Sequence, residues 1–331
     1  MQIALIYNAP IPSLYDARGE SKAESGVLEA VKAVRRSIRA LGYNLVEFPL
    51  VPPLSSVRKT LSSVNADCVF NLFEGFAGLP RTEAEVADCL EELELPFTGS
   101  PSLALLLALD KAATARELSR HGIRTAAQQL LNTETVSGFR LKFPCIVKPR
   151  ADDASHGLSE NSVVFDTGAL FQEVKATVDR YDGAPALVEE FLPGREFNVT
   201  VFGNSTPEVL PLSEIIYTLP AGLPKILTFA AKWEPESSYF QNTNVKCPAE
   251  VTPELAADLR STALAAFKSI GCRGYARVDM RLDPEGHPVV MEVNANPDLS
   301  PDAGTVRQAK KSGLSYKGMV SRIIEFALEK A

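Results

Sequence analysis

Two strand-like runs near the C-terminus, residues 274–282 and 289–297, constrain the fold of this chain more than any other segment. The residues between them, Asp283-Pro284-Glu285-Gly286, are typical of a turn. Side chains alternate between the faces of a strand, so each run separates apolar from polar residues. One face would carry Ala276, Val278, Met280, Leu282, Val289, Met291 and Val293. The opposite face would carry Arg277, Asp279, Arg281, Val290, Glu292 and Asn294. The pattern therefore predicts a β-hairpin with one apolar and one charged face.

The charged face of this hairpin has two interpretations. Strand pairing would gather Asp279, Glu292 and Asn294 beside Arg277, and such oxygen ligands suit a hard cation, for example Mg²⁺ bridging phosphates. The solvated face of an ordinary antiparallel sheet shows the same alternation. The hairpin alone leaves both interpretations open, and other segments have to decide between them.

Size and composition exclude several classes of protein. A chain of 331 residues exceeds one average domain, which predicts two or three domains. It is 45% hydrophobic and 23% charged, and no apolar run approaches the ~20 residues that span a bilayer. The net charge of −7 has no long block of one sign, which argues against nonspecific nucleic-acid binding. We therefore expect a globular protein without a membrane or nucleic-acid partner.

The cysteines and the N-terminus indicate the compartment. Five widely spaced cysteines form neither a disulfide framework nor a zinc-ligand pattern. The chain begins directly with the strand-like run Ile3–Tyr7, without a basic segment or a cleavage site of a signal peptide. Both features favour a cytoplasmic location.

The order of the predicted elements indicates an α/β (α+β) fold. In the first 98 residues strands and helices alternate, which is typical of a parallel α/β unit. The predicted strands, besides the hairpin, lie at 3–7, 45–48, 68–72, 143–149, 187–192, 195–202 and 209–212. The predicted helices lie at 27–41, at 102–121 with a break near Asp110-Lys111, at 253–270 and at 317–330. Residues 220–248 lack periodicity and predict a long loop, a kind of segment that often carries function.

A lysine and the loop after it are candidate phosphate ligands. Lys148 ends an apolar strand just before Pro149. If its ammonium group is buried there, it needs an anionic partner such as a phosphate. The alternative is that the lysine side chain emerges from the strand end into solvent. The following segment, 150–157, has a Ser155-His156-Gly157 tip whose backbone N–H groups could cover phosphates, with His156 expected to be exposed there. No P-loop or dinucleotide-binding glycine motif occurs in the chain.

Taken in order, these segments resemble the ATP-grasp superfamily, and within it the D-alanine–D-alanine ligase branch. The resemblance covers roughly residues 66–328. It is carried by Asn71–Gly75, Asp110-Lys111, the strand with Lys148, Ser155–Gly157, Leu187–Leu192 with Glu196, Arg277–Asp279 and Glu292–Asn294. It implies three domains: an N-terminal α/β substrate domain at 1–98, a central domain at 99–188 and a C-terminal domain at 189–331, with ATP between the last two.

The resemblance also implies a role for each matched residue. Lys111 and Lys148 would contact the ATP phosphates, and Ser155 would cover them. Glu189 and the backbone near Leu192 would hold adenine, and Glu196 the ribose hydroxyls. Asp279, Glu292 and Asn294 would bind Mg²⁺, as two ions, with Mn²⁺ as an alternative. Arg277 would stabilise the oxyanion, and Lys232 would lie in a lid loop. Glu74 would lie near the substrates.

The implied reaction joins a carboxylate to an amine. The carboxylate attacks the γ-phosphate of ATP, and the amine then displaces phosphate from the acyl phosphate to form an amide, such as a dipeptide. Closure of a lid would keep water away from the acyl phosphate. The partners implied are amino-acid or small carboxylate and amine substrates, and a homodimer is common in the family.

The chain departs from the family pattern around the amino-acid substrates. Asn8–Ser13 replaces a Gly-rich loop, and Glu20 or Glu24 is a candidate for the carboxylate that anchors the first amino group. Trp233 stands where the ligases carry Tyr, as a lid residue or a packing anchor. Ala303 stands where a Ser would bind the second carboxylate.

Asp298 is the departure with the clearest chemical consequence. The chain has Pro297-Asp298-Leu299-Ser300 where the family pattern is Pro-Gly-Met-Thr. Asp298 is either a turn residue or a negative charge that repels the carboxylate of an acceptor. The hypothesis is a ligase with altered acceptor specificity. The alternatives are a genuine D-alanine–D-alanine ligase of peptidoglycan synthesis and an ATP-binding regulator without ligase activity.

Overall fold

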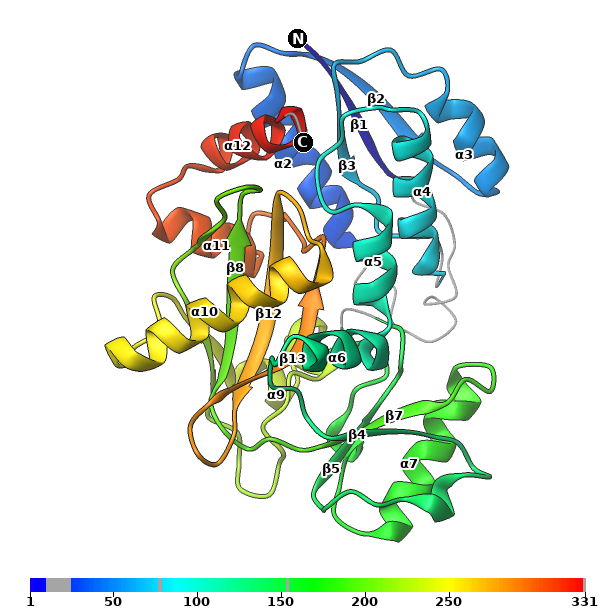
Figure 1. Ribbon diagram of the computed structural model, residues 1–331, viewed down its shortest axis with the longest axis vertical. Helices are drawn as coiled ribbons and strands as arrows, with labels where there is room; N and C mark the ends of the chain where they lie inside the picture. The colour runs from blue at the N-terminus through cyan, green and yellow to red at the C-terminus, as the bar shows by residue number, and fades with distance from the viewer. Residues whose placement is uncertain (10–24, 77–78, 153–154, 330–331) are drawn as a thin grey trace.

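The computed structural model describes residues 1–9, 25–76, 79–152 and 155–329, and the strands in these ranges form three sheets (Figure 1). The predicted N-terminal loop, with Glu20 and Glu24, lies outside the described residues. None of the helices in these ranges has both the length and the apolar character needed to span a membrane.

The first sheet is parallel, in the order β2-β1-β3. Its strands are β1 (Gln2–Asn8), β2 (Asn44–Leu50) and β3 (Cys68–Leu72). Alternation along β1 points Ile3 and Leu5 to one side and Ala4 and Ile6 to the other. The first side is covered by α2 (Ser25–Ala40) and α12 (Tyr316–Leu328), the second by α3 (Leu54–Leu61) and α4 (Arg81–Glu92) (Figure 1). The predicted parallel α/β unit is confirmed.

The second sheet is antiparallel, in the order β4-β7-β5-β6. Its strands are β4 (Gln128–Leu131), β5 (Cys145–Lys148), β6 (Val163–Val164) and β7 (Ala186–Glu190). Helix α7 (Thr167–Arg180) contributes Leu170 and Val174 to a small core with Cys145 and Val188. Single helical turns occur at Val136–Gly138 and Glu160–Ser162. This sheet carries Lys148 at the end of β5.

The third sheet is also antiparallel and contains the predicted hairpin. Its order is β11-β10-β8-β12-β13, with β9 paired to β8. Its strands are β8 (Glu196–Phe202), β9 (Glu208–Val209), β10 (Ser213–Tyr217), β11 (Thr243–Lys246), β12 (Tyr275–Leu282) and β13 (Pro288–Asn294). Helices α5 (Ser102–Leu109), α6 (Lys111–Arg120) and α10 (Pro253–Ile270) cover its apolar face, and α11 (Gly304–Lys311) packs against the other.

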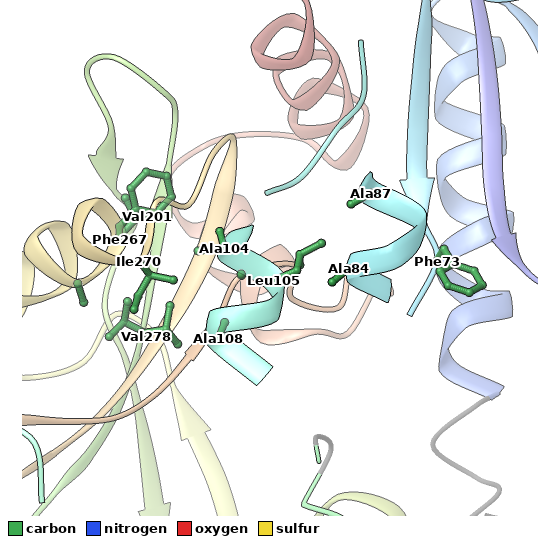
Figure 2. Close-up of a cluster of buried hydrophobic side chains, with 14 of the residues drawn as sticks. Phe73, Ala84, Ala87, Ala104, Leu105, Ala108, Val201, Phe267, Ile270 and Val278 are labelled. Carbon is green, nitrogen blue, oxygen red and sulfur yellow. The ribbon is translucent and has the colours of Figure 1, made fainter. Parts of the chain in front are cut away.

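A single core joins the apolar face of this sheet to the first unit. Figure 2 shows Val201 and Val278 from the sheet, Phe267 and Ile270 from α10, and Ala104, Leu105 and Ala108 from α5. Helix α5 therefore lies between the sheet and α4, which contributes Ala84 and Ala87 to the same cluster (Figure 2). Small residues on both helices allow this close approach.

A β-bulge corrects part of the predicted hairpin. Asp279 pairs with Glu292, but the next pair is Met280 with Val290, so Met291 is the extra residue. After the bulge the faces are exchanged. Val290 lies in the core beside Met280, and Met291 lines a cavity on the charged side. The prediction that placed Met291 on the apolar face and Val290 on the charged face was wrong.

The segment 220–248 contains more structure than the predicted loop. It forms α8 (Phe229–Trp233), α9 (Ser238–Gln241) and strand β11. Thr228 caps the first helix by accepting from the N–H of Ala231 at 3.0 Å, and Ser237 caps the second in the same way. These helices are too short to show a period. The strand predicted at 209–212 is also wrong beyond Val209, which ends β9.

Gly194, in the turn between β7 and β8, provides a test of this packing. A Cβ at Gly194 would lie 2.2 Å from the backbone oxygen of Leu282. We expect Gly194→Ala to lower the free energy of unfolding by about 1–3 kcal/mol, because backbone must move. Urea denaturation measures this. Gly138→Ala is the control, since a Cβ there meets no atom within 4 Å. Equal stability of the two variants would contradict the packing.

Candidate active site

The charged face of the hairpin and the second sheet enclose one cavity. Side chains reach it from β5, β7, β8, β12, β13, the N-terminus of α6 and helix α8. The predicted site residues that line it are Lys111, Lys148, Ser155, Glu189, Leu192, Glu196, Lys232, Asp279 and Glu292. Residues far apart in the chain, such as Lys111 and Glu292, therefore meet at one place.

Two lysines enter the cavity from different elements. Lys148 is 9% exposed, and its Nζ lies 2.5 Å from Oε2 of Glu189 on the neighbouring strand. The alternative of a lysine emerging into solvent is wrong for this residue. Lys111, the first residue of α6, has its Nζ 2.7 Å from Oε1 of Glu292 and donates to the backbone oxygen of Asp152. Both ammonium groups thus have carboxylate partners inside the cavity.

Strand pairing builds a second cluster around Asp279. The guanidinium of Arg277 donates to both of its oxygens at 2.7 Å. Asn198 on β8 donates to Oδ1 at 2.7 Å, and Asn294 on β13 donates to Oδ2 at 3.2 Å. The registers explain this arrangement, since Asp279 pairs with Asn198 on one side and with Glu292 on the other. Arg277 and Asn294 adjoin the cavity through this cluster.

The lysines hold Glu292 in its charged form. Burial by itself would raise the pKa of Glu292, but Lys111, then Lys148 and Lys232, outweigh it and lower the pKa to about 2. Burial lowers the pKa of Lys232, and Arg277 adds to this, while Glu292 acts in the opposite direction. Several cationic groups in the cavity therefore lie within electrostatic reach of one carboxylate. The positive charge of these groups suits the cavity to bind a polyphosphate.

The residues predicted to hold Mg²⁺ fit a hard cation. Asp279 and Glu292 face each other across one strand pair, and Asn294 donates through its nitrogen, which leaves its amide oxygen as an acceptor. In the described ranges no group of three His, Cys, Asp or Glu residues is arranged as a metal site. The protein thus offers two carboxylates and one amide, and phosphates and water would complete a magnesium shell.

The loop after β5 packs against helix α8, which carries the predicted lid residue Lys232. Ser155 has a left-handed backbone with φ of +62°. His156 is 4% exposed, with its ring centroid 5.5 Å from that of Phe229 in α8, so the expectation of an exposed tip was wrong. Phe229 also packs against Trp233 at 6.5 Å, and its N–H donates to the backbone oxygen of Leu158. The loop and α8, which carries Lys232, therefore close over the cavity together.

Two predicted residues lie away from this cavity. Glu74 follows β3 at an exposed position, and its N–H donates to Oδ1 of Asn8 at 2.9 Å. Its role near the substrates stays a prediction. Asp298 accepts from the N–H of Ser300 at 2.7 Å and from its hydroxyl at 2.6 Å, which is the geometry of a turn residue.

Sequence reasoning missed Asn198, Tyr217 and Met291. Asn198 follows Glu196 on the same face of β8, and this alternation was the one signal for it. Tyr217 belongs to β10, where its hydroxyl donates to Glu196 at 2.7 Å, and no local pattern reveals that contact. The bulge places Met291 in the cavity.

A parallel α/β unit followed by two antiparallel sheets, with lysines and carboxylates between those sheets, defines an ATP-grasp protein. Residues 115–325 match the family described as the D-ala D-ala ligase C-terminus. The chain belongs to the D-alanine–D-alanine ligase family, and the predicted resemblance is confirmed.

Individual relatives and a solved structure are similar to this chain over most of its length. An uncharacterized protein of Sinorhizobium fredii is 37% identical over 78% of this chain and 74% of its own. A D-alanine–D-alanine ligase of Carboxydothermus hydrogenoformans is 30% identical over 94% of this chain and 96% of its own. The solved D-alanine–D-alanine ligase of Bacillus anthracis complexed with ATP is similar in fold, with a TM-score of 0.74 and 22% identity over 99% of this chain and 97% of that one.

The hydrogen bond from Asn198 to Asp279 gives a prediction about metal affinity. We expect Asn198→Ala to weaken Mn²⁺ or Mg²⁺ binding about tenfold or more, because Asp279 loses a donor that fixes its carboxylate. Metal titration in the presence of nucleotide measures this. Asn244→Ala, an exposed position on β11 of the same sheet, is the control and should bind metal normally. Unchanged affinity in the first variant would contradict this role.

Proposed function

We propose that this protein joins a carboxylate to an amine at the expense of ATP, through an acyl phosphate. Its family membership supports ATP-dependent ligase chemistry, and the relatives named as D-alanine–D-alanine ligases support a peptide-like product. The observation that carries the proposal is the single cavity shared by Lys111, Lys148, Lys232, Asp279 and Glu292.

Each step of the reaction uses groups in this cavity. An oxygen of the first carboxylate attacks the γ-phosphorus, the bond from that phosphorus to the β,γ-bridging oxygen breaks, and ADP leaves. Lys111 and Lys148 neutralise the charge that accumulates on the phosphates. The amine then attacks the acyl carbon, the C–O bond to phosphate breaks, and the amine loses a proton. Arg277 stabilises the oxyanion of the tetrahedral intermediate.

The nucleotide is held by the cavity walls in this proposal. Glu189 and the backbone of Leu192 contact adenine, and Glu196 contacts the ribose. The loop with Ser155 and the lid with Lys232 exclude water from the acyl phosphate. Asp279, Glu292 and Asn294 would hold two Mg²⁺ ions, or Mn²⁺ in their place, which would neutralise phosphate charge.

The proposal extends to the domains. The units 1–98, 99–188 and 189–331 act as substrate, central and C-terminal domains, with ATP between the last two. Glu74 lies on the side of the first unit that meets the amino-acid substrates. The chain forms a homodimer.

The acceptor in this proposal is an amine other than D-alanine. Burial lowers the pKa of Arg277, but the charges of Asp279, Glu292 and Asp298 together raise it above its usual value. The charge of Asp298 therefore acts on this guanidinium. A carboxylate whose charge reaches Arg277 disfavours an acceptor that would place its own carboxylate near this guanidinium. Ala303 cannot offer the hydroxyl that would bind one. A basic or uncharged amine fits better.

A genuine D-alanine–D-alanine ligase is the second candidate, favoured by the names of relatives such as the Carboxydothermus hydrogenoformans protein. An ATP-binding regulator is the third. The two ligases differ in the acceptor that they use, and the regulator differs from both because it releases no phosphate when substrates are added.

A phosphate-release screen over pairs of D- and L-amino acids, amino-acid amides and diamines tests the proposal. We expect release with an acceptor that lacks a carboxylate, and no release from Asp279→Asn or Glu292→Gln, which lose a metal ligand while remaining folded. Release with D-alanine alone would identify the second candidate. Full activity of either variant would refute the proposed site.

The role of Asp298 has its own test. We expect Asp298→Asn to raise kcat/KM about fivefold for an acceptor that carries a carboxylate, since removing one like charge is worth about 1 kcal/mol. The asparagine keeps one oxygen for the N–H of Ser300, and its amide nitrogen can donate to the hydroxyl of Ser300. Steady-state kinetics measures the change, with Asp302→Asn as a control for net charge. An equal response in both variants would assign the effect to long-range charge.

A further inference from the structure

Arg281 is a buried cation on the charged face of the hairpin, two residues beyond Asp279. It is 3% exposed and lines the cavity. Four of its contacts are hydrogen bonds, to segments far apart in the chain, and its guanidinium lies over the rings of Phe191 at 5.3 Å and Tyr217 at 5.8 Å. A guanidinium offers five N–H donors in a fixed plane, so it can orient several acceptors at once.

The first acceptor is Glu196. Arg281 donates to Oε2 through Nε at 3.0 Å and through a terminal nitrogen at 2.6 Å, and the hydroxyl of Tyr217 donates to the same oxygen at 2.7 Å. Burial, then the charge of Glu196, raises the pKa of Tyr217 well above its usual value, so the hydroxyl keeps its proton. Three donors saturate Oε2. Within the described part of the chain Oε1 receives no hydrogen bond, and it is the oxygen left for a ligand.

The second acceptor is the backbone oxygen of Leu192, 2.7 Å from the other terminal nitrogen of Arg281. Leu192 also lines the cavity, and its N–H donates to no other residue among those described. The bond from Arg281 holds the Leu192–Pro193 peptide group, which directly follows the N–H of Leu192 in the chain. The third acceptor is the backbone oxygen of Lys225, in the segment that leads to the lid helix α8.

We infer that Arg281 is a positioning residue for the nucleoside: it holds Glu196 with Oε1 towards the ribose hydroxyls, and it anchors the backbone at Leu192 beside adenine. The inference rests on the proposed function, because it takes ATP as the ligand of this cavity. Its contact with Lys225 ties the same guanidinium to the lid segment. The hydrogen bonds of Arg281 go to Glu196, Leu192 and Lys225, so we expect its effect to fall on nucleoside recognition.

Binding calorimetry with ATP, 2′-deoxy-ATP and 3′-deoxy-ATP on the full chain, with Mg²⁺ and without the other substrates, tests this inference. A hydrogen bond from ribose to a carboxylate should make ATP bind about tenfold more tightly than at least one deoxy analogue. Arg281→Met should reduce that preference to less than about threefold, because Glu196 is no longer oriented. Glu196→Gln is the positive control and should reduce it as well.

Two further variants separate positioning from stability. Arg195→Met breaks a similar arginine–carboxylate pair, with Glu214 at 2.6 Å, outside the cavity, and should keep the preference for ATP. Tyr217→Phe removes one donor to Glu196 and leaves the Arg281–Glu196 pair intact. It should reduce the preference about threefold even if Arg281→Met does not fold.

The possible failures are distinct. If Arg281→Met weakens ATP and both analogues by the same factor, while Glu196→Gln removes the preference, Arg281 is merely structural and the inference is overturned. An unchanged preference in Tyr217→Phe, or equal binding of ATP and both analogues to the unmodified protein, also overturns it and leaves ATP binding in place. Absence of any ATP binding by the unmodified protein defeats the proposed function itself.

Discussion

The pairing of β12 with β8 on one side and β13 on the other is the constraint on which the site depends. This register places Asp279 between Asn198 and Glu292, and Arg277 between Thr200 and Asn294. A slip by one residue would exchange the faces of β12, moving its charges into the core and its apolar residues into the cavity. Because burying unpaired charge is so costly, the apolar core beneath the sheet also fixes the position of the charged groups above it.

Charges in the cavity are paired before any ligand arrives. Lys111 is held by Glu292 and Lys148 by Glu189, while Arg281 is held by Glu196. A polyphosphate that enters therefore meets cations already desolvated and directed into one space. Such preorganisation lowers the cost of ordering side chains on binding, and it is how an electrostatic site stabilises charge that develops during phosphoryl transfer.

How much of the fold and of the site could be predicted from the sequence depends on whether each interaction is local in the chain. Alternation along β12 predicted the charged face with Arg277 and Asp279. The family resemblance predicted Lys111 and Lys148, which precede this strand by more than a hundred residues. The bulge at Met291 had no local signal, because one inserted residue keeps the apolar composition while it reverses the faces. Asn198 and Tyr217 donate hydrogen bonds to residues of other strands. Their roles therefore follow from the register of the sheet and not from a local sequence pattern.

Under the proposed function the site has a nucleotide side and an acceptor side, and the two differ in how firmly the fold holds them. On the nucleotide side, Arg281 links β12 to the backbone of Leu192 and Lys225, so a change there disturbs several segments. On the acceptor side, the hydrogen bonds of Asp298 go to Ser300, two residues away. Side chains in a local turn can be replaced without repacking the sheet. Side chains in a hydrogen-bond network shared by several segments cannot. Under the proposed function, this difference gives a physical reason why the departures predicted from the sequence gather around the acceptor, while the residues predicted to face the nucleotide match the family pattern.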